Sequence, residues 1–177
     1  GEAAARRVFT VVDLEPQIFD KPDAIELDEA ITSVEFDNVF FTYPNTSVPV
    51  LSGISFKAEG GDFLGIMGHT GAGKTTILKL LMRYYTPSSG GVLINGRSID
   101  DYTLDSVRDK IGFVSQEPFL FYGSIKDNVI YNQIATDEEL QRALELAGAW
   151  DFIQDLEDNL DTMVGDRGAK LSGGQRA

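Results

Sequence analysis

Alternating apolar and polar side chains predict strands in the first two thirds of the chain. Residues 33–43 are rich in β-branched and aromatic side chains, and they predict a strand with an irregularity near Asn38. Residues 54–58 alternate in the same way, whereas residues 63–67 form a continuous apolar run that is typical of a buried parallel strand. The remaining predicted strands are residues 92–94, which lead into the turn Asn95-Gly96, and residues 111–114.

Helical spacing of apolar residues follows these strand patterns. Residues 77–84 carry apolar side chains on both faces, which predicts a helix that is buried nearly all round. Two further helices are expected because Ser124 with Asp127, and Thr136 with Glu139, have the spacing of helix capping boxes. An apolar stripe then runs along the helix that Thr136 begins, at Leu140, Ala143, Leu144 and Ala147. Strands first and helices later imply an α/β core with added subdomains.

The first thirty residues follow neither of these patterns clearly. Residues 1–14 have a helix-like apolar spacing and resemble the tail of a helix, and Pro16 interrupts it. Residues 15–31 are acidic, contain Pro16 and Pro22, and predict an extended surface linker. We therefore place a domain boundary near Ala30, with residues 1–30 as a helix end and linker and residues 31–177 as the domain proper.

Composition narrows the class of protein. A chain of 177 residues with 42% hydrophobic content suits one globular domain with its own core. A net charge of -13 would repel a polyanionic backbone, so no nucleic-acid partner is expected. The chain has no cysteine, which excludes disulfides, and no apolar run reaches the roughly 18 residues that a membrane span requires.

A glycine-rich loop carries the strongest chemical signal. It lies between the predicted strand at residues 63–67 and the predicted helix, as a P-loop requires. Its residues are Gly68, His69, Thr70, Gly71, Ala72, Gly73, Lys74 and Thr75. Backbone N–H groups of such a loop face phosphate oxygens, Lys74 is expected to reach the β- and γ-phosphates, and the Thr75 hydroxyl is expected to bind Mg²⁺. Thr76 is expected to add a phosphate hydrogen bond, and His69 is expected to be a variable, partly exposed loop position.

A second motif lies about a hundred residues downstream. It consists of Leu171, Ser172, Gly173, Gly174 and Gln175. Ser172 and the glycine N–H groups are expected at a helix N-terminus, which is a second surface suited to a phosphate. The chain would thus carry two phosphate-binding surfaces.

Together the two motifs resemble those of the ABC ATPases, whose signature reads LSGGQ, over about residues 34–177. The resemblance implies a P-loop NTPase (RecA-like) core with an antiparallel β-subdomain and an α-helical subdomain, and it implies ATP and Mg²⁺ as ligands. It also implies a head-to-tail pair of nucleotide-binding domains, in which the P-loop of one faces the signature of the other.

Other positions match this family individually. Tyr43 falls where the family keeps an aromatic residue that stacks on adenine, with a core tyrosine as the alternative. Gln116 matches the glutamine that contacts Mg²⁺ and the attacking water. Residues 118–125 and 162–168 resemble exporter loops, although Asp166 stands where glutamate is commoner. Residues 1–16 are similar to the exit from an exporter's last membrane helix, which implies an upstream transmembrane domain and a place at the cytoplasmic face of a membrane.

The family continues beyond the signature into a strand ending in Asp-Glu and a histidine loop, so the resemblance implies a domain that is incomplete at its C-terminus. That strand would lie beside residues 63–67, whose side chains should otherwise be exposed. No catalytic base is assigned; ATPase activity is expected of the intact protein and at best weak nucleotide binding of this chain alone. The alternatives are a soluble ABC-type ATPase of DNA repair or translation and, more remotely, a P-loop kinase or GTPase, which would leave the signature without a role.

Overall fold

The computed structural model describes residues 18–116, 118–131, 133–165 and 171–176. The chain divides into two compact units, Gly1–Gly112 and Phe113–Ala177, and each has its own apolar core. Expectations for residues 1–17, and for Asp166 in the second exporter-like loop, lie outside the described residues.

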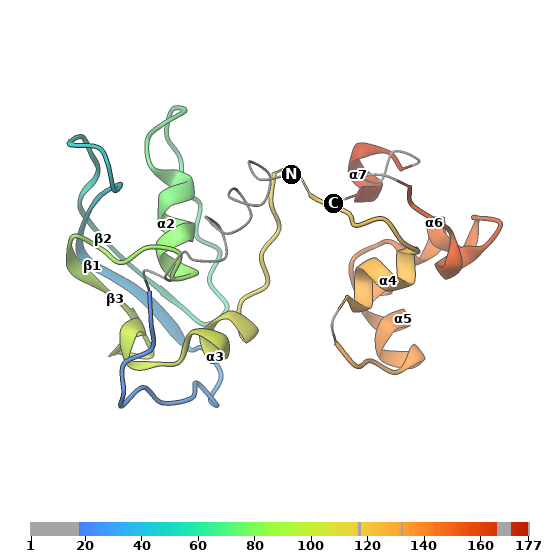
Figure 1. Cartoon of the computed structure of the whole chain (residues 1–177), viewed down its shortest axis with the longest axis horizontal. Helices are drawn as coiled ribbons and strands as arrows, with labels where there is room; N and C mark the ends of the chain where they lie inside the picture. Colours follow the sequence, from blue (N-terminus) through green and yellow to red (C-terminus); the bar gives the residue numbers. More distant parts are fainter. Residues whose placement is uncertain (1–17, 117, 132, 166–170, 177) are drawn as a thin grey trace, which may run out of the picture. The chain divides into compact units, whose positions relative to one another are not determined.

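The first unit is built on a four-stranded antiparallel sheet with the order β2-β1-β3-β4 (Figure 1). Its strands are β1 (Ser33–Thr42), β2 (Pro49–Glu59), β3 (Ser89–Ile94) and β4 (Arg97–Ser98). The predicted irregularity in β1 is confirmed, because the pairing register shifts after Phe36 and Asn38 has a φ of 47°. The predicted turn at Asn95-Gly96 joins β3 to β4, and both residues have positive φ, as a tight hairpin requires.

Helix α2 (Lys74–Leu81) packs on this sheet beside the strands β1 to β3 (Figure 1). Ile77 and Leu80 are buried in the same core as Phe41 and Leu51. The prediction of a helix buried nearly all round is wrong, since Leu78 is 41% exposed. The rest of the unit is the 3₁₀ turn η1 (Ile99–Asp101) and helix α3 (Leu104–Asp109), which Thr103 caps.

Residues 63–67 are not a strand in the described structure, which corrects the sequence prediction. Their apolar side chains are solvent-accessible, with Phe63 103% and Met67 95% exposed. Residues 111–114 likewise form no strand. A strand forms only where its N–H and C=O groups pair with a neighbouring strand, and among the described residues no strand is paired with 63–67. The expected exposure of these side chains is therefore observed.

The acidic segment before β1 is integrated into the first unit more firmly than a surface linker would be. Leu27 is only 1% exposed and belongs to the core. The Ile25 N–H donates to the Asp101 carbonyl at 3.0 Å, and the Thr103 N–H donates to the Ile25 carbonyl at 2.9 Å. Asn95 Nδ2 also donates to the carbonyl of Ala30 at 2.9 Å. Ile25 and Leu27 lie among many carboxylates, so their spacing shows too little periodicity to predict this packing. The boundary near Ala30 stays a prediction.

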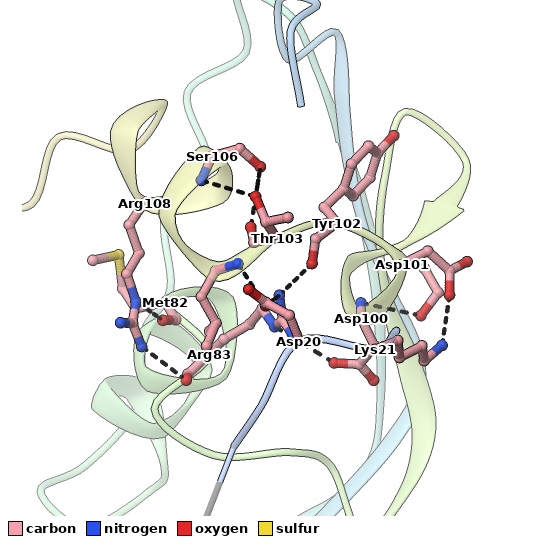
Figure 2. Close-up of polar contacts among 12 residues, drawn as sticks. Asp20, Lys21, Met82, Arg83, Asp100, Asp101, Tyr102, Thr103, Ser106 and Arg108 are labelled. Carbon is pink, nitrogen blue, oxygen red and sulfur yellow. Dashed lines mark hydrogen bonds and ion pairs between the residues drawn. The ribbon is translucent and has the colours of Figure 1, made fainter. Parts of the chain in front are cut away.

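Two arginines fasten the C-terminal end of α2 (Figure 2). Arg83 has a φ of 51° and is 3% exposed, and its Nη1 donates to the Tyr102 carbonyl at 2.6 Å and lies 3.6 Å from Asp20 Oδ1. Arg108 donates from Nε to the Met82 carbonyl at 3.1 Å and from Nη2 to the Arg83 carbonyl at 3.2 Å. A guanidinium group can donate hydrogen bonds to the last carbonyls of a helix, and its positive charge is stabilising near the negative end of the helix dipole. The helix that begins at the glycine-rich loop is thus held firmly at its other end.

The second unit is helical. It contains α4 (Ile125–Ile130), α5 (Asp137–Leu146), α6 (Trp150–Gln154), the 3₁₀ turn η2 (Asn159–Asp161) and α7 (Gly173–Arg176). Its core consists of Ile125, Leu140, Leu144, Ile153 and Val164. Both predicted capping boxes are confirmed, one at Ser124 and Asp127 and one at Thr136 and Glu139. Of the predicted stripe on α5, Leu140 and Leu144 are buried.

These capping boxes predict a loss of stability in acid. The Ser124 backbone N–H and then its hydroxyl hold the pKa of Asp127 below its usual range, and the corresponding groups of Thr136 do the same for Glu139. A lowered folded pKa gives stability that is present above the unfolded pKa and is lost as pH falls through the folded one. We therefore expect the melting temperature to decrease once the pH is lowered beyond about 4. In the double variant Asp127→Asn/Glu139→Gln, the melting temperature should decrease less between neutral and acid pH.

Thermal unfolding followed by circular dichroism between pH 6 and pH 2.5 measures this effect. Glu138→Gln is the matched control, because it removes a carboxylate from the first turn of α5 without touching a capping box. The double variant should already melt lower at pH 6 and should then change less in acid than this control. Equal acid dependence in the double variant and the control would contradict the assignment.

Candidate functional site

The glycine-rich loop leads directly into α2, and within the described part of the chain no side chain caps the start of that helix. Gly73 is its N-cap residue, with a φ of 89° and no side-chain hydrogen bond. The hydroxyls of Thr103, Ser124 and Thr136 cap α3, α4 and α5. The first-turn N–H groups of α2 therefore have no side-chain hydroxyl at the N-cap to bond with, unlike those of α3, α4 and α5. They also lie at the positive end of the helix dipole. This is the backbone arrangement that binds an anion.

Gly73 fixes the start of α2 against the sheet. A Cβ at this position would lie 2.7 Å from Leu51 Cδ2 and 3.1 Å from the Val50 carbonyl oxygen. Only a residue without a side chain fits this close approach at positive φ. Within the loop, the Ala72 N–H donates to the His69 carbonyl at 3.1 Å, and the Thr76 N–H donates to the Gly73 carbonyl at 2.9 Å.

The Lys74 side chain lies back across the loop. Its Nζ donates to the Gly68 carbonyl at 2.7 Å and to the His69 carbonyl at 2.8 Å. These contacts hold a positive charge over the loop, where an anion bound by the loop amides would meet it. His69, for which partial exposure is expected, is exposed, and its Nδ1 lies 2.8 Å from the Thr70 carbonyl oxygen.

The two threonines after Lys74 differ in their surroundings. Thr75 is exposed, and its hydroxyl makes no hydrogen bond within the described part of the chain. A free hydroxyl oxygen at this place fits a hard cation such as Mg²⁺, which prefers oxygen ligands. Thr76, in contrast, is 4% exposed, and its Oγ1 lies 3.0 Å from the hydroxyl oxygen of Tyr43. The phosphate contact of Thr76, which is expected from the sequence, stays a prediction.

Tyr43 stands in an aromatic group beside α2. Its ring lies edge-on to Phe41 at 4.9 Å and to Tyr85 at 5.1 Å, between ring centroids. The Lys79 ammonium lies 5.3 Å from the centre of the Tyr43 ring. Sequence reasoning identified Tyr43 but missed Lys79 and Tyr85. The signal for Lys79 was available, because residues three apart on a helix, such as Thr76 and Lys79, share one face.

The second motif begins a helix, as predicted. Gln175 Oε1 accepts from the Ser172 N–H at 2.9 Å, and the Gln175 N–H donates to Ser172 Oγ at 3.3 Å. This reciprocal pair is a capping box at the start of α7. Leu171 packs against the core of the second unit, whereas Gly173 and Gly174 carry nothing that would shield the first turn.

Gln116 belongs to the second unit and is exposed. Thr75 belongs to the first unit, so a Mg²⁺ site shared by these two residues stays a prediction from the resemblance. None of the helices that the structure describes has the length and hydrophobicity of a transmembrane segment.

Comparison with known proteins identifies the family. The ABC transporter family model matches residues 51–177. The chain is 41% identical over 177 residues to the ATP-dependent lipid A-core flippase of Desulfotalea psychrophila, covering 99% of this chain and 31% of that protein. It is 39% identical over 179 residues to ABC transporter B family member 29, chloroplastic, of Arabidopsis thaliana, covering 99% of this chain and 28% of that protein.

A solved structure agrees in both fold and sequence. The structure of a bacterial Atm1-family ABC exporter with ATP bound matches with a TM-score of 0.87 and 38% identity, over 97% of this chain and 30% of that one. The chain thus spans about three tenths of the length of the proteins it resembles. The expected fold is confirmed, and each of these proteins is named as a transporter, flippase or exporter rather than as a repair or translation factor. The chain belongs to the ABC transporter family.

Proposed function

We propose that this chain is the ATP-binding part of an ABC exporter that uses ATP binding and hydrolysis to move a substrate across a membrane. The observation that carries the proposal is the start of α2, where uncapped N–H groups and the Lys74 ammonium converge on the loop of Gly68 to Gly73. An anion bound there meets backbone dipoles and a full positive charge together. In this family the anion is the triphosphate of ATP.

Different residues bind the phosphates, the Mg²⁺ and the adenine base of the nucleotide. The amides of the loop and of the first turn of α2 bind the phosphates, and Lys74 exchanges its bonds with the loop carbonyls for the β- and γ-phosphate oxygens. The exposed hydroxyl of Thr75 is placed for Mg²⁺, which neutralises phosphate charge when bound, and Gln116 is the second candidate ligand. The Tyr43 ring offers a face or edge to the adenine base.

A second nucleotide-binding domain completes the site in this proposal. Ser172, Gly173 and Gly174 at the start of α7 would face the triphosphate that the opposite copy holds. The capping box keeps the Ser172 N–H bonded to Gln175. The Ser172 hydroxyl and the N–H groups of the two glycines therefore remain to bind the triphosphate. A two-fold pair of domains then buries two ATP molecules in one interface. A transmembrane domain on the same polypeptide would place the pair at the cytoplasmic face of the membrane.

Cross-linking in the intact transporter tests this arrangement. The chain has no cysteine, so His69→Cys within the P-loop and Arg176→Cys beside the signature introduce two reactive sites in this region. Cysteines elsewhere in the transporter would be replaced by serine, and two differently tagged copies would be combined. A bismaleimide should join the copies in the presence of Mg-ATP and fail to join them without nucleotide.

A control pair moves the second cysteine to Thr86, an exposed residue of the first unit that is remote in sequence from the signature. It should give little cross-linking with or without Mg-ATP. If the His69 and Arg176 sites react equally without nucleotide, or only within one copy, the head-to-tail pair is wrong.

A further inference from the structure

The stretch before β1, residues 18–31, is held more firmly in its second half than in its first. From Ile25 onward its contacts are buried or made by the backbone. Leu27 is 1% exposed and belongs to the core of the first unit, and the backbone of Ile25 bonds to Asp101 and to Thr103. Breaking these contacts would expose an apolar side chain and leave backbone groups without partners. The second half is therefore a fixed part of the first unit.

The first half, residues 18–24, which we call the latch, is held by side chains at the surface. None of residues 18–24 is buried. Asp20 Oδ1 accepts the Leu104 N–H at 2.8 Å, and Lys21 Nζ donates to Asp101 Oδ1. The side chains of Asp20, Lys21 and Asp101 are 39%, 49% and 40% exposed. Water competes for polar contacts this exposed and salt screens them, so they contribute little and break easily.

The latch closes on the C-terminal end of α2, the helix that begins at the P-loop (Figure 2). Arg83 directly follows the C-cap residue Met82 and is 3% exposed. Its guanidinium lies near two carboxylates, because Nη1 is 3.6 Å from Asp20 Oδ1 and Nε is 3.7 Å from Asp100 Oδ1. A buried charge is tolerated only where opposite charges or hydrogen bonds compensate it. Release of the latch therefore removes one of the two carboxylates near this arginine.

Asp20 reaches the end of α2 by a second route, through α3. Leu104 is the first residue of α3, and Arg108 in the last turn of that helix donates to the carbonyls of Met82 and Arg83. The bond from the Leu104 N–H to Asp20 therefore ties the latch to the helix that holds α2. The P-loop lysine is the first residue of this eight-residue α2. Hydrogen bonds and short rigid elements of this kind can carry coupling between two places in a protein.

We propose that the latch is a releasable contact between the polypeptide that precedes residue 18 and the end of the P-loop helix. It is closed in this structure. Opening breaks the contacts of Asp20 and Lys21, whereas Ile25 and Leu27 stay in place, so the chain swings from a fixed point at Ile25. In the proposed function a transmembrane domain lies upstream, and the latch passes its movement to α2; this consequence rests on the proposed function. ATP turnover then requires the latch to open in each cycle.

Reversible cross-linking in the intact transporter, in lipid nanodiscs, tests whether opening is required. Lys21→Cys/Asp101→Cys places one thiol on each side of the latch, in a protein whose other cysteines are replaced by serine. A short bis-methanethiosulfonate locks the latch closed, and dithiothreitol releases it. We expect ATP turnover of the locked protein to fall roughly fivefold or more and to recover on reduction, because a required conformational step is blocked. The Kd for Mg-ATP should change less than about twofold, since the P-loop is formed while the latch is closed.

The matched control uses a second exposed ion pair of the first unit. Lys57 Nζ lies 2.6 Å from Glu59 Oε1, and both residues belong to β2. Cross-linking Lys57→Cys to Glu59→Cys joins two residues of one strand and does not touch the latch. ATP turnover of this variant should be the same before and after reduction.

Hydrogen exchange at the Leu104 amide follows opening directly and needs no ATP turnover. The first N–H groups of a helix have no partner within it, so the protection of this amide depends on Asp20. Asp20→Ala should speed its exchange roughly tenfold or more, as measured by mass spectrometry with residue-level fragmentation. Exchange in the unaltered transporter should also become faster with rising KCl, because salt screens the contacts of the latch. Asp23→Ala, at an exposed aspartate of the latch that does not accept this N–H, is the matched control.

Each measurement can overturn the proposal. If the locked protein turns over ATP as fast as the reduced protein, opening is not required. If locking abolishes Mg-ATP binding as well as turnover, the closed latch does not belong to the state with a formed P-loop. If Asp20→Ala exchanges no faster than Asp23→Ala, the latch does not hold α3. A transporter without turnover that depends on Lys74 would instead contradict the proposed function, and the exchange at Leu104 would still decide whether the latch opens.

Discussion

Replacing Lys74 by alanine should raise the Kd for Mg-ATP by roughly 100-fold, the largest effect on binding that we expect from one side chain. Its Nζ already makes two hydrogen bonds across the loop, to the Gly68 and His69 carbonyls at 2.7 Å and 2.8 Å. On binding, these would be exchanged for two charged bonds to phosphate oxygens. A hydrogen bond to a charged group contributes about 1.5 to 3 kcal/mol, and 1.4 kcal/mol corresponds to tenfold in Kd. Calorimetry on the intact transporter measures the change.

The fold should tolerate this substitution. The two carbonyls that Lys74 leaves belong to exposed residues, and water can take its place. The melting temperature should therefore stay within about 2 °C of the unaltered protein, as expected of a change at the surface. Lys74→Arg should not restore binding, because a planar guanidinium differs in shape from a compact ammonium. Lys57→Ala, at an exposed lysine of β2, is the matched control, and a Lys74→Ala protein that binds within threefold of it would contradict the assignment.

Replacing Gly90 by alanine should destabilise the first unit more than any other small substitution considered for it. Gly90 has a φ of 77° and faces the irregularity in β1. A Cβ there would lie 2.2 Å from the Asn38 carbonyl oxygen and 2.5 Å from that of Asp37. These are backbone atoms of a paired strand, so they can move only if β1 and β3 separate. We expect a loss of about 3 to 5 kcal/mol, or roughly 10 °C or more in melting temperature.

Gly61→Ala isolates the steric part of this loss. Gly61 has a φ of 90°, and a Cβ there would meet nothing within 4 Å. It therefore carries only the cost of the backbone conformation, about 1 to 2 kcal/mol. Scanning calorimetry of both variants gives the difference, and equal melting temperatures would show that the close approach of Gly90 to Asn38 is not tight.

Local signals predicted the elements that depend on neighbours in sequence. Asn95-Gly96 predicted a hairpin because only certain residues adopt the left-handed conformation that it needs. Ser124 and Thr136 predicted helix starts because a cap and its acidic partner lie three residues apart. The P-loop and the start of α7 were found in the same way, since each motif contains both the turn and the first helical residues.

Elements that depend on distant partners were not predictable in the same way. Residues 63–67 have the composition of a buried strand, but composition cannot supply the strands that would pair with them. Leu27 lies among acidic residues, and nothing local shows that it enters the core of the first unit. The contact between Thr76 and Tyr43 depends on how α2 packs beside β1, and no pattern within α2 reveals it.

The burial of Leu27 bears on how this module can be exchanged between transporters. A graft that starts after Ala30 would leave an apolar hole of one leucine side chain, at a cost of about 2 to 5 kcal/mol, and would abandon the bond from Asn95 to the Ala30 carbonyl. Asp20, which receives the Leu104 N–H at 2.8 Å and faces Arg83, would be lost as well. A chimaera therefore has to carry the stretch from Asp20 onward with the nucleotide-binding half, because that stretch contributes to the core and to the hydrogen bonds of the first unit.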